Sequence, residues 1–354
     1  MKKLRVAIVG QGRSGYGIHG HYFKSELNDK YEVVAVVDRL ESRREKAKKD
    51  WDCDVYASHE ELYARDDIDL VVNSTFSFMH KDVTKDLLSH GFNVVCEKPF
   101  VKSYEDGQEL INLAKKNGVM VNVFQQSRFA PYYRKIKEII ASGVLGEPIQ
   151  YSISFSGFNR RWDWQTSLAY MGGNVRNTGP HPLDQAMDIL GFPEECNVFS
   201  SLGRVNTYGD AEDYAKIVLT VPGKPLVDVE ISSCNPYSDF TYKIHCKNGG
   251  LKATQSDIEY KYYDLKSAPE QHQILDPLTG EDGEPAYCSD KLEWTEEKIH
   301  VEGSAFLEGT STYYTMIYDY LVNGKAMEIT PEQVLTQLKV IDKIHAQNPL
   351  TMKE

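Results

Sequence analysis

The first 125 residues alternate short apolar runs with longer segments in which apolar and polar residues are mixed. The apolar runs, rich in Val, lie at residues 4–9, 31–37, 69–73, 92–96 and 119–123. Residues 83–90 and 104–117 have the spacing of amphipathic helices. Strands that alternate with helices of this length predict an α/β domain built on a doubly wound parallel sheet.

The pattern changes from residue 149 onward, where alternating runs follow one another with few helices between them. The predicted strands lie at residues 150–155, 198–204, 215–221, 226–232 and 242–246. Gly, Pro and Asn between these runs predict an α+β domain with an open, mostly antiparallel sheet. Residues 264–300 are polar and contain three prolines, so we expect them to leave the sheet.

The chain length and these two patterns together predict two domains. A chain of 354 residues is long enough for about two typical domains. We place the first domain at residues 1–124 and the second at residues 125–354. We expect the last helices of the second domain to pack back toward the first.

A glycine-rich turn follows the first predicted strand. Its sequence is Gly-Gln-Gly-Arg-Ser-Gly at residues 10–15, and the second predicted strand ends at Asp38. The order strand, glycine turn, helix, strand, acid is the arrangement of a dinucleotide-binding Rossmann domain. Gly10 permits the tight turn, Gly12 lets the backbone approach a pyrophosphate, and Gly15 allows close packing of helix and strand.

The acid at the end of the second strand indicates which dinucleotide is bound. Asp38 can accept hydrogen bonds from both ribose hydroxyls and would repel a 2′-phosphate, which favours NAD. Arg39 could instead pair with that phosphate, so NADP is possible. Ligands of such sheets bind beyond the carboxyl ends of the strands. The predicted cofactor-binding residues are Gly10, Gln11, Gly12, Arg13, Ser14, Gly15, Asp38, Arg39, Ser74, Thr75, His80, Glu97, Lys98 and Gln126.

Composition and charge exclude several classes of partner. The formal net charge of −12 disfavours binding to nucleic acid or to anionic membranes. No apolar stretch is long enough for a membrane helix. The six cysteines are scattered, and neither cysteines nor histidines have the spacing of a metal site. We therefore expect no bound metal. Because the N-terminal apolar run is too short for a signal peptide and is interrupted by Arg5, we expect a cytoplasmic protein.

Several motifs along the chain resemble one family of oxidoreductases. They include the glycine turn at residues 10–15, Cys-Glu-Lys-Pro-Phe at 96–100, the segment 125–148, and the segment 172–184 with its Gly-Pro-His-Pro-Leu-Asp ending. In this order they resemble the glucose-fructose oxidoreductase, inositol dehydrogenase and rhizopine-catabolism (Gfo/Idh/MocA) family. The resemblance implies an NAD- or NADP-dependent enzyme of sugars, inositols or their derivatives. It also implies a homodimer or homotetramer formed through the open sheet of the second domain.

The resemblance also implies a catalytic constellation. Lys98 and His181 match the lysine and histidine that the family uses, but Asn177 stands where an aspartate is usual. A neutral amide can orient a hydroxyl but adds no charge. Aromatic and cationic residues near residue 160 suit a sugar, because rings pack on its C–H face and arginine binds hydroxyl or anionic groups. The predicted substrate-binding residues are Lys98, Arg160, Trp162, Asn177, His181 and Tyr314.

Three functions are compatible with these residues. The leading hypothesis is reversible hydride transfer between nicotinamide and a secondary hydroxyl or ketone, with Lys98 and His181 as the proton relay. An alternative is an NAD-dependent glycosidase of the same fold with no net redox change. The third is a cofactor-binding sensor without catalysis, which Asn177 permits but the presence of Lys98 and His181 opposes.

Overall fold

The N-terminal apolar runs form a six-stranded parallel sheet. The computed structural model describes residues 2–352, and the strand order in this sheet is β3-β2-β1-β4-β5-β6. The strands are β1 (Leu4–Val9), β2 (Tyr31–Val37), β3 (Asp54–Tyr56), β4 (Leu70–Asn73), β5 (Val94–Cys96) and β6 (Val121–Val123). This is the predicted Rossmann-like arrangement, with the extra short strand β3 at its edge.

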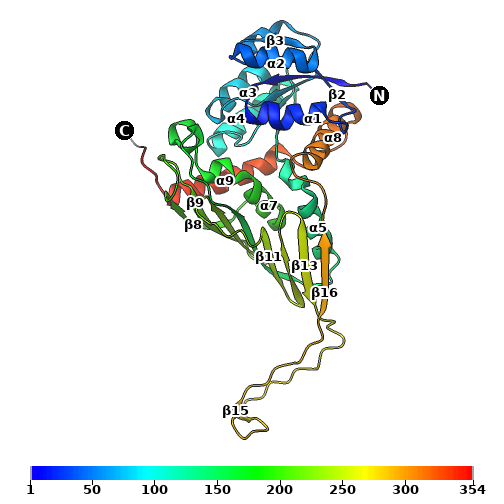
Figure 1. Cartoon of the computed structure of the whole chain (residues 1–354), viewed down its shortest axis with the longest axis vertical. Helices are drawn as coiled ribbons and strands as arrows, with labels where there is room; N and C mark the ends of the chain where they lie inside the picture. Colours follow the sequence, from blue (N-terminus) through cyan, green and yellow to red (C-terminus); the bar gives the residue numbers. More distant parts are fainter. Residues whose placement is uncertain (1, 353–354) are drawn as a thin grey trace.

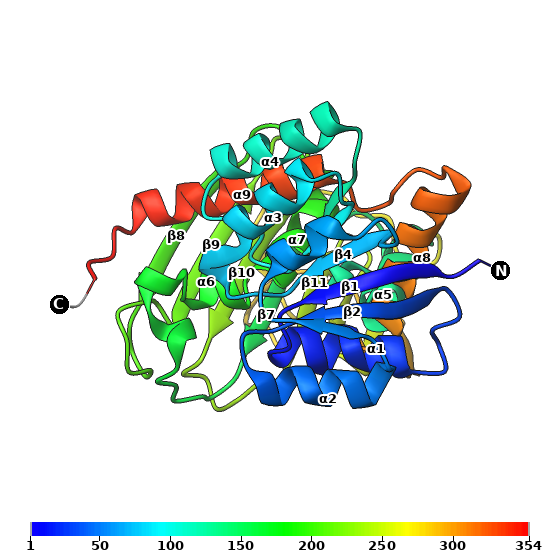
Figure 2. The same cartoon turned by 90° about the horizontal axis from the view of Figure 1, so that it is seen from above.

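Helices cover both faces of this sheet, which explains its continuous apolar strands. Side chains of β1 and β2 pack on one face against α1 (His21–Lys24), α2 (Glu41–Trp51) and α8 (Glu308–Asn323). Alternate side chains of the same strands pack on the other face against α3 (His80–Ser89), α4 (Tyr104–Asn117) and α9 (Pro331–Gln347). The two C-terminal helices therefore lie against the N-terminal domain, as the orange and red helices of Figure 2 show.

The second domain is built on an eight-stranded mixed sheet in the order β16-β13-β12-β11-β7-β10-β9-β8. Only β7 and β10 pair in parallel among these strands, and the other pairs are antiparallel. The strands are β7 (Pro148–Ser156), β8 (Asn197–Gly203), β9 (Tyr214–Thr220), β10 (Leu226–Ser232), β11 (Tyr242–Cys246), β12 (Gly249–Ala253), β13 (Asp257–Tyr262) and β16 (Thr295–His300).

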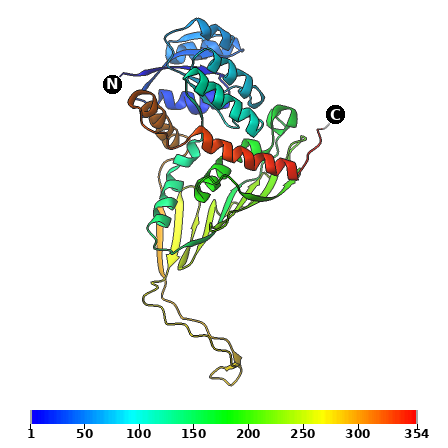
Figure 3. The ribbon, with the colours of Figure 1, turned by 180° about the vertical axis from the view of Figure 1, so that it is seen from behind.

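One face of this sheet carries the core of the second domain. Its apolar side chains pack against α5 (Pro131–Ala141), α7 (Pro180–Leu190) and the C-terminal part of α9. The opposite face has polar side chains such as Lys243 and Asp228 and no covering helix in the described chain (Figure 3). The sheet is therefore open on one side.

A long hairpin leaves the sheet between β13 and β16 and projects away from the rest of the molecule (Figure 1). It contains the short strands β14 (Leu278–Thr279) and β15 (Pro285–Ala286). The sequence predicted this excursion at residues 264–300, and its end was wrong. Residues 295–300 are β16, which pairs with β13 at the sheet edge. Polar residues at five of its six positions hid this strand, because only one face of an edge strand packs on the core.

Candidate active site

The glycine turn between β1 and the first helix is packed tightly against the neighbouring strand. Gly10 has a φ of +95°, and a Cβ there would lie 2.5 Å from the carbonyl oxygen of Ser74. A Cβ on Gly15 would lie 1.9 Å from the carbonyl oxygen of Gly10. At Gly12, by contrast, a Cβ would meet no protein atom within 4 Å. The protein itself requires the first and third glycines, whereas the second leaves space open for a ligand.

Polar groups at this turn fit a dinucleotide. The side-chain amide of Gln11 is buried, and neither its nitrogen nor its oxygen has a hydrogen-bond partner among the described residues. Asp38, at the end of β2, accepts hydrogen bonds from the backbone N–H of Gln11 at 2.8 Å and of Leu40 at 2.9 Å. Arg39 is exposed beside it. The open space at Gly12 and the unpartnered Gln11 amide are the features expected of a cradle for a bound dinucleotide.

Ser74 and His80, two of the predicted residues after β4, support the glycine turn and the neighbouring loops through hydrogen bonds. The Ser74 hydroxyl donates to the carbonyl oxygens of Val9 and Gly10 at 3.0 and 2.8 Å. His80 is buried and lies between the carbonyl oxygens of Pro99 and Thr75, at 2.7 and 3.2 Å from its two ring nitrogens. It therefore connects the loops that follow β4 and β5. Gln126, also in the predicted set, is buried in the short helix η4 (Gln126–Phe129).

Lys98 is held between the two domains. It follows β5, and its ammonium donates a 2.8 Å hydrogen bond to the backbone carbonyl of Asn177, the last residue of α6 (Asn174–Asn177). Burial lowers the pKa of Lys98, and the nearby Glu97 carboxylate opposes part of this shift. The contact that the structure shows is thus with the main chain of Asn177. The Asn177 side-chain oxygen instead accepts a 3.0 Å hydrogen bond from Gln165.

A buried acid lies directly behind Lys98. One carboxylate oxygen of Glu97 accepts from the backbone N–H of Lys98 at 2.9 Å, and the other lies 3.2 Å from a ring nitrogen of His19. The second ring nitrogen of His19 lies 2.7 Å from the Tyr314 hydroxyl. Burial by itself would raise the pKa of Glu97, but the hydrogen bond and charge of His19, together with the charges of Lys98 and His80, lower it to about 2. Tyr314, which the sequence placed with the substrate, is completely buried in this chain of contacts.

His181 lies at the start of α7, on the same side of the domain junction as Asn177. Its Nδ1 is 3.1 Å from the hydroxyl of Ser127 in η4. Burial, reinforced by the positive charge of Lys98, lowers the pKa of His181 to about 3. The ring is therefore neutral at physiological pH and can accept a proton.

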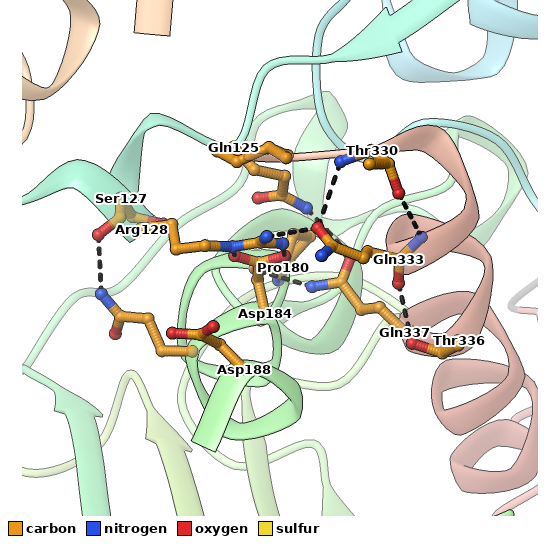
Figure 4. A network of polar contacts seen from close by, with 12 residues as sticks. Gln125, Ser127, Arg128, Pro180, Asp184, Asp188, Thr330, Gln333, Thr336 and Gln337 are labelled. Atoms are coloured by element: carbon orange, nitrogen blue, oxygen red, sulfur yellow. Dashed lines mark hydrogen bonds and ion pairs between the residues drawn. The ribbon is translucent and has the colours of Figure 1, made fainter. Parts of the chain in front are cut away.

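A buried polar network holds the backbone of Ser127 and of Pro180, the residue before His181 (Figure 4). Arg128 and Asp184 form an ion pair with both side chains at most 1% exposed, and Arg128 Nε donates to Asp184 at 2.8 Å. Gln337 of α9 donates to the carbonyl of Pro180 at 2.6 Å, and Gln185 donates to the carbonyl of Ser127 at 2.8 Å. Hydrogen bonds among η4, α7 and α9, which are distant in sequence, thus fix the positions of Ser127 and His181 relative to each other.

The aromatic and cationic segment after β7 is only partly at the site. Trp162 is 77% exposed, and Arg160 is exposed as well. Arg161 instead donates 2.8 Å hydrogen bonds to Asp163 and contacts the Gln165 side chain that bonds Asn177. The structure therefore brings together Lys98, Asn177 and His181, and connects Arg161 to them.

Aromatic rings from both domains meet beside this group. Phe76, after β4, lies edge-on to Trp164 with ring centroids 5.1 Å apart. Phe78 lies edge-on to Tyr170 at 4.9 Å. Sequence reasoning missed these pairs because the partners are about 90 residues apart. The aromatic clustering near residue 160 was the available signal, but it did not identify which ring contacts the first domain.

Glu212 is a further residue that the sequence did not single out. Its carboxylate accepts a 3.0 Å hydrogen bond from the backbone N–H of Val175, in the first turn of α6. Gly173 makes room for it, since a Cβ there would lie 2.3 Å from a Glu212 carboxylate oxygen. Burial raises the pKa of Glu212 to about 7. The acid thus holds the short helix that ends at Asn177.

Among residues 2–352, no helix has the length and apolar character needed to cross a membrane. The same part of the chain has no group of three or more His, Cys, Asp or Glu side chains arranged to hold a metal ion.

Comparison with known families assigns both domains. Residues 4–125 match the profile described as an oxidoreductase family with an NAD-binding Rossmann fold, and residues 133–252 match the GFO/IDH/MocA C-terminal domain. The chain belongs to the Gfo/Idh/MocA family of oxidoreductases, as the sequence motifs predicted.

Individual relatives are distant. An uncharacterized oxidoreductase of Schizosaccharomyces pombe, C115.03, is 30% identical to this protein over 66% of this chain. The match covers 66% of that relative, so this chain spans just under two thirds of the relative's length. The scyllo-inositol 2-dehydrogenase (NADP(+)) IolW of Bacillus subtilis is 26% identical over 96% of this chain and 92% of its own. An Agrobacterium radiobacter oxidoreductase, solved with NAD+, L-tartaric acid and magnesium, superposes with a TM-score of 0.77 at 18% identity, covering 99% and 98% of the two chains.

Proposed function

We propose that the protein is an NAD-dependent dehydrogenase that interconverts a secondary hydroxyl and a ketone on a sugar, an inositol or a related cyclic polyol. The observation that carries this proposal is the convergence of Lys98 and His181 at the domain junction, beside the glycine turn of an NAD-binding domain. The whole-length similarity to an inositol dehydrogenase supports the substrate class.

The first domain would hold the cofactor. The turn at residues 10–15 would receive the pyrophosphate over Gly12, and Asp38 would accept hydrogen bonds from the adenosine ribose. The carboxylate of Asp38 disfavours a 2′-phosphate, which supports NAD over NADP. When bound, nicotinamide supplies the hydride acceptor or donor at C4.

The chain's own groups would manage the proton of the substrate hydroxyl. In the oxidative direction, His181 accepts this proton, since its ring is neutral and Ser127 holds Nδ1 so that Nε2 faces the substrate. A histidine with a pKa of about 3 is a weak base, so proton transfer to it requires that the negative charge developing on the substrate oxygen be stabilised. Lys98 stabilises this charge by donating a hydrogen bond to the same oxygen.

Neighbouring residues would position the substrate. The chain of contacts from Arg161 through Gln165 fixes the Asn177 amide, which then orients a second hydroxyl. The edge-on rings of Phe76 and Trp164 offer apolar C–H and π surfaces at the same junction. Trp164 thus suits the aromatic role better than the exposed Trp162 that the sequence favoured.

To test this proposal, the purified protein is mixed with either NAD or NADP and with one compound from a panel of inositols, aldoses, sugar phosphates and uronates. The absorbance of reduced nicotinamide then measures turnover. We expect reduction of NAD with one polyol or sugar. Lys98→Met and His181→Gln should each lower kcat by about 10²–10⁴-fold with little change in cofactor affinity. The exposed His300→Gln is the matched control and should retain full activity.

Other results would reject the assignment. Full activity of either variant would remove Lys98 or His181 from the reaction. Absence of reduction, together with cofactor retained through purification and cleavage of a glycoside, would indicate the non-redox glycosidase. Tight cofactor binding without turnover of any compound would indicate the sensor.

A further inference from the structure

Three buried side chains behind Lys98, which we call the buried triad, are in mutual contact and take no direct part in the proposed reaction. They are Tyr314 of α8, His19 of η1 (Gly15–Gly20) and Glu97, just after β5, and each is at most 3% exposed. The Tyr314 hydroxyl lies 2.7 Å from His19 Nδ1, and His19 Nε2 lies 3.2 Å from a Glu97 carboxylate oxygen. The other oxygen of Glu97 accepts the backbone N–H of Lys98 at 2.9 Å. A residue of the C-terminal segment is therefore connected to Lys98.

The donors and acceptors of the buried triad follow from its chemistry. Glu97 is ionised, since its pKa is about 2, and a carboxylate can only accept hydrogen bonds. His19 Nε2 therefore carries the ring proton and donates to Glu97, which leaves Nδ1 as an acceptor. Burial raises the pKa of Tyr314 well above its ordinary value, so its hydroxyl keeps its proton and donates to Nδ1. Tyr314 thus selects the tautomer of His19 that bonds Glu97.

Aromatic packing holds the first two members of the triad in place. The Tyr314 ring stacks on Tyr22 with centroids 5.0 Å apart and an interplanar angle of 3°. The backbone carbonyl of Tyr314 accepts a 2.8 Å hydrogen bond from the Tyr31 hydroxyl. The His19 ring lies against Phe124 with centroids 4.3 Å apart. Because these contacts leave the phenol and the imidazole little freedom, they also fix the position of the carboxylate that His19 bonds.

The Glu97 carboxylate supplies negative charge beside Lys98. Burial lowers the pKa of Lys98 and the charges of Arg13 and Arg161 lower it further, whereas Glu97 raises it. Burial keeps the other titratable groups around Glu97 uncharged at neutral pH, because it raises the pKa of a thiol and a phenol and lowers the pKa of two imidazoles. These groups are Cys96, Tyr313, His80 and His181. The charge of Lys98 therefore depends on where the Glu97 carboxylate is held.

We propose that Tyr314 and His19 are positioning residues for the reaction: their hydrogen bonds hold the Glu97 carboxylate where it fixes the Lys98 backbone and stabilises the positive charge of the Lys98 side chain. This inference rests on the proposed function, in which that charge stabilises the substrate oxygen. It gives α8, a helix of the C-terminal segment, a part in the chemistry at the end of β5. It also explains why polar groups lie in this aromatic part of the core.

The pH dependence of kcat tests the buried triad, because a residue that only stabilises the fold would not move it. Lys98 can donate to the developing oxyanion only while it is protonated, so kcat should fall as pH rises through the pKa of Lys98. Tyr314→Phe removes one hydroxyl and loosens Glu97, so this alkaline limb should move to lower pH by about 0.5–1 unit. The KM for the substrate should stay within about twofold of the parent value.

Tyr313→Phe is the matched control for this measurement. Tyr313 is the preceding residue and equally buried, and its hydroxyl donates a 2.7 Å hydrogen bond to Asn122 instead of His19. Both variants lose one buried hydrogen bond, so we expect similar losses in the free energy of unfolding. Only Tyr314→Phe should shift the alkaline limb. The same pH profile for the two variants would overturn the inference.

A double-mutant cycle tests whether Tyr314 acts through His19. His19→Leu removes both hydrogen bonds of the ring and should move the alkaline limb at least as far as Tyr314→Phe does. Tyr314→Phe should add no further shift in the His19→Leu protein, and an additive shift would contradict the proposed route. His19→Gln, whose amide can still donate to Glu97, should restore part of the parent profile. The same cycle with His19→Gln replaces the first one if the leucine variant does not fold.

A direct measurement on Lys98 separates this inference from the proposed function. The rate at which acetic anhydride modifies Lys98, followed by peptide mass spectrometry as pH is raised, reports the fraction of neutral amine without any substrate. Its midpoint should move to lower pH in Tyr314→Phe, further in Glu97→Gln, and not in Tyr313→Phe. A shifted midpoint in a protein without dehydrogenase activity would reject the proposed function alone. An unshifted midpoint in an active dehydrogenase would reject the positioning role alone.

Discussion

The glycine turn of the first domain and the junction around His181 are both tightly packed, but they are built in different ways. The turn is made from residues 10–15 and the adjoining loop after β4, where backbone meets backbone. The junction combines residues near 98, 127, 177, 184 and 333, whose polar side chains satisfy one another in the interior. The turn therefore depends on the absence of side chains, and the junction depends on side chains that arrive from distant segments.

The largest effect should come from the turn itself. Gly15→Ala would place a Cβ 1.9 Å from the carbonyl oxygen of Gly10, a backbone atom that cannot yield easily. We expect a loss of about 4 kcal/mol or more in the free energy of unfolding, measured by urea denaturation. Gly12→Ala is the matched control, because its Cβ meets no protein atom within 4 Å. It should leave stability unchanged and weaken dinucleotide binding. Equal stability of both variants would contradict this distinction.

The next effect should come from the junction. Asp184→Asn leaves the Arg128 guanidinium buried without a counter-charge, which should cost about 3 kcal/mol of stability. The control is Glu332→Gln, which removes an exposed ion pair with Lys115 and should change stability by less than about 1 kcal/mol. Thermal and urea unfolding of both variants would measure the difference. Similar losses of unfolding free energy in the two variants would show that burial does not determine how much the Arg128–Asp184 ion pair contributes to stability.

A smaller, pH-dependent effect should arise at Glu212. Its pKa is about 7 in the folded chain, above the ordinary value of 4.5, so the folded state holds this proton more tightly than the unfolded chain. Stability should therefore fall as pH rises from about 4.5 to 7. Glu212→Gln keeps an oxygen for the Val175 N–H and removes the titration. It should be more stable than the parent by about 3 kcal/mol near pH 8 and equal near pH 4. A constant difference across this range would be inconsistent with titration of Glu212.

The smallest effect should come from Asn177→Asp. A carboxylate at the residue whose carbonyl contacts Lys98 should raise the pKa of the lysine, which burial now lowers. We expect a shift of the pH profile of kcat toward higher pH and a change in kcat within about tenfold. Asn177→Ala, measured in parallel, separates the added charge from the lost amide. If Asn177→Asp abolishes activity while the protein stays folded, a neutral amide is required at this position.

The site residues differ in how far the sequence could predict them. Lys98, Asn177 and His181 were predicted together, because short motifs identify them, and the structure brings them to one junction. Arg161 could not be chosen over Arg160 from sequence, since the choice depends on which side chain reaches Gln165. Tyr314 was predicted to contact the substrate, yet it packs in the first domain against His19, about 295 positions away. The role of Glu212 had no local signal. Ser127 lies in the recognised segment 125–148, but its contact with His181 could not be predicted because the two residues are 54 positions apart.

The sequence by itself determined the parallel sheet, the glycine turn, the open second sheet and the family. These features depend on strand and helix periodicity and on short motifs that are recognisable before the distant contacts of their residues are known. Only the tertiary structure decided which buried polar groups share hydrogen bonds, which arginine belongs to the site and where the hairpin after β13 ends in β16. Those outcomes depend on contacts between segments up to about 300 residues apart. A polar residue becomes favourable in the interior only when such a segment supplies its partner.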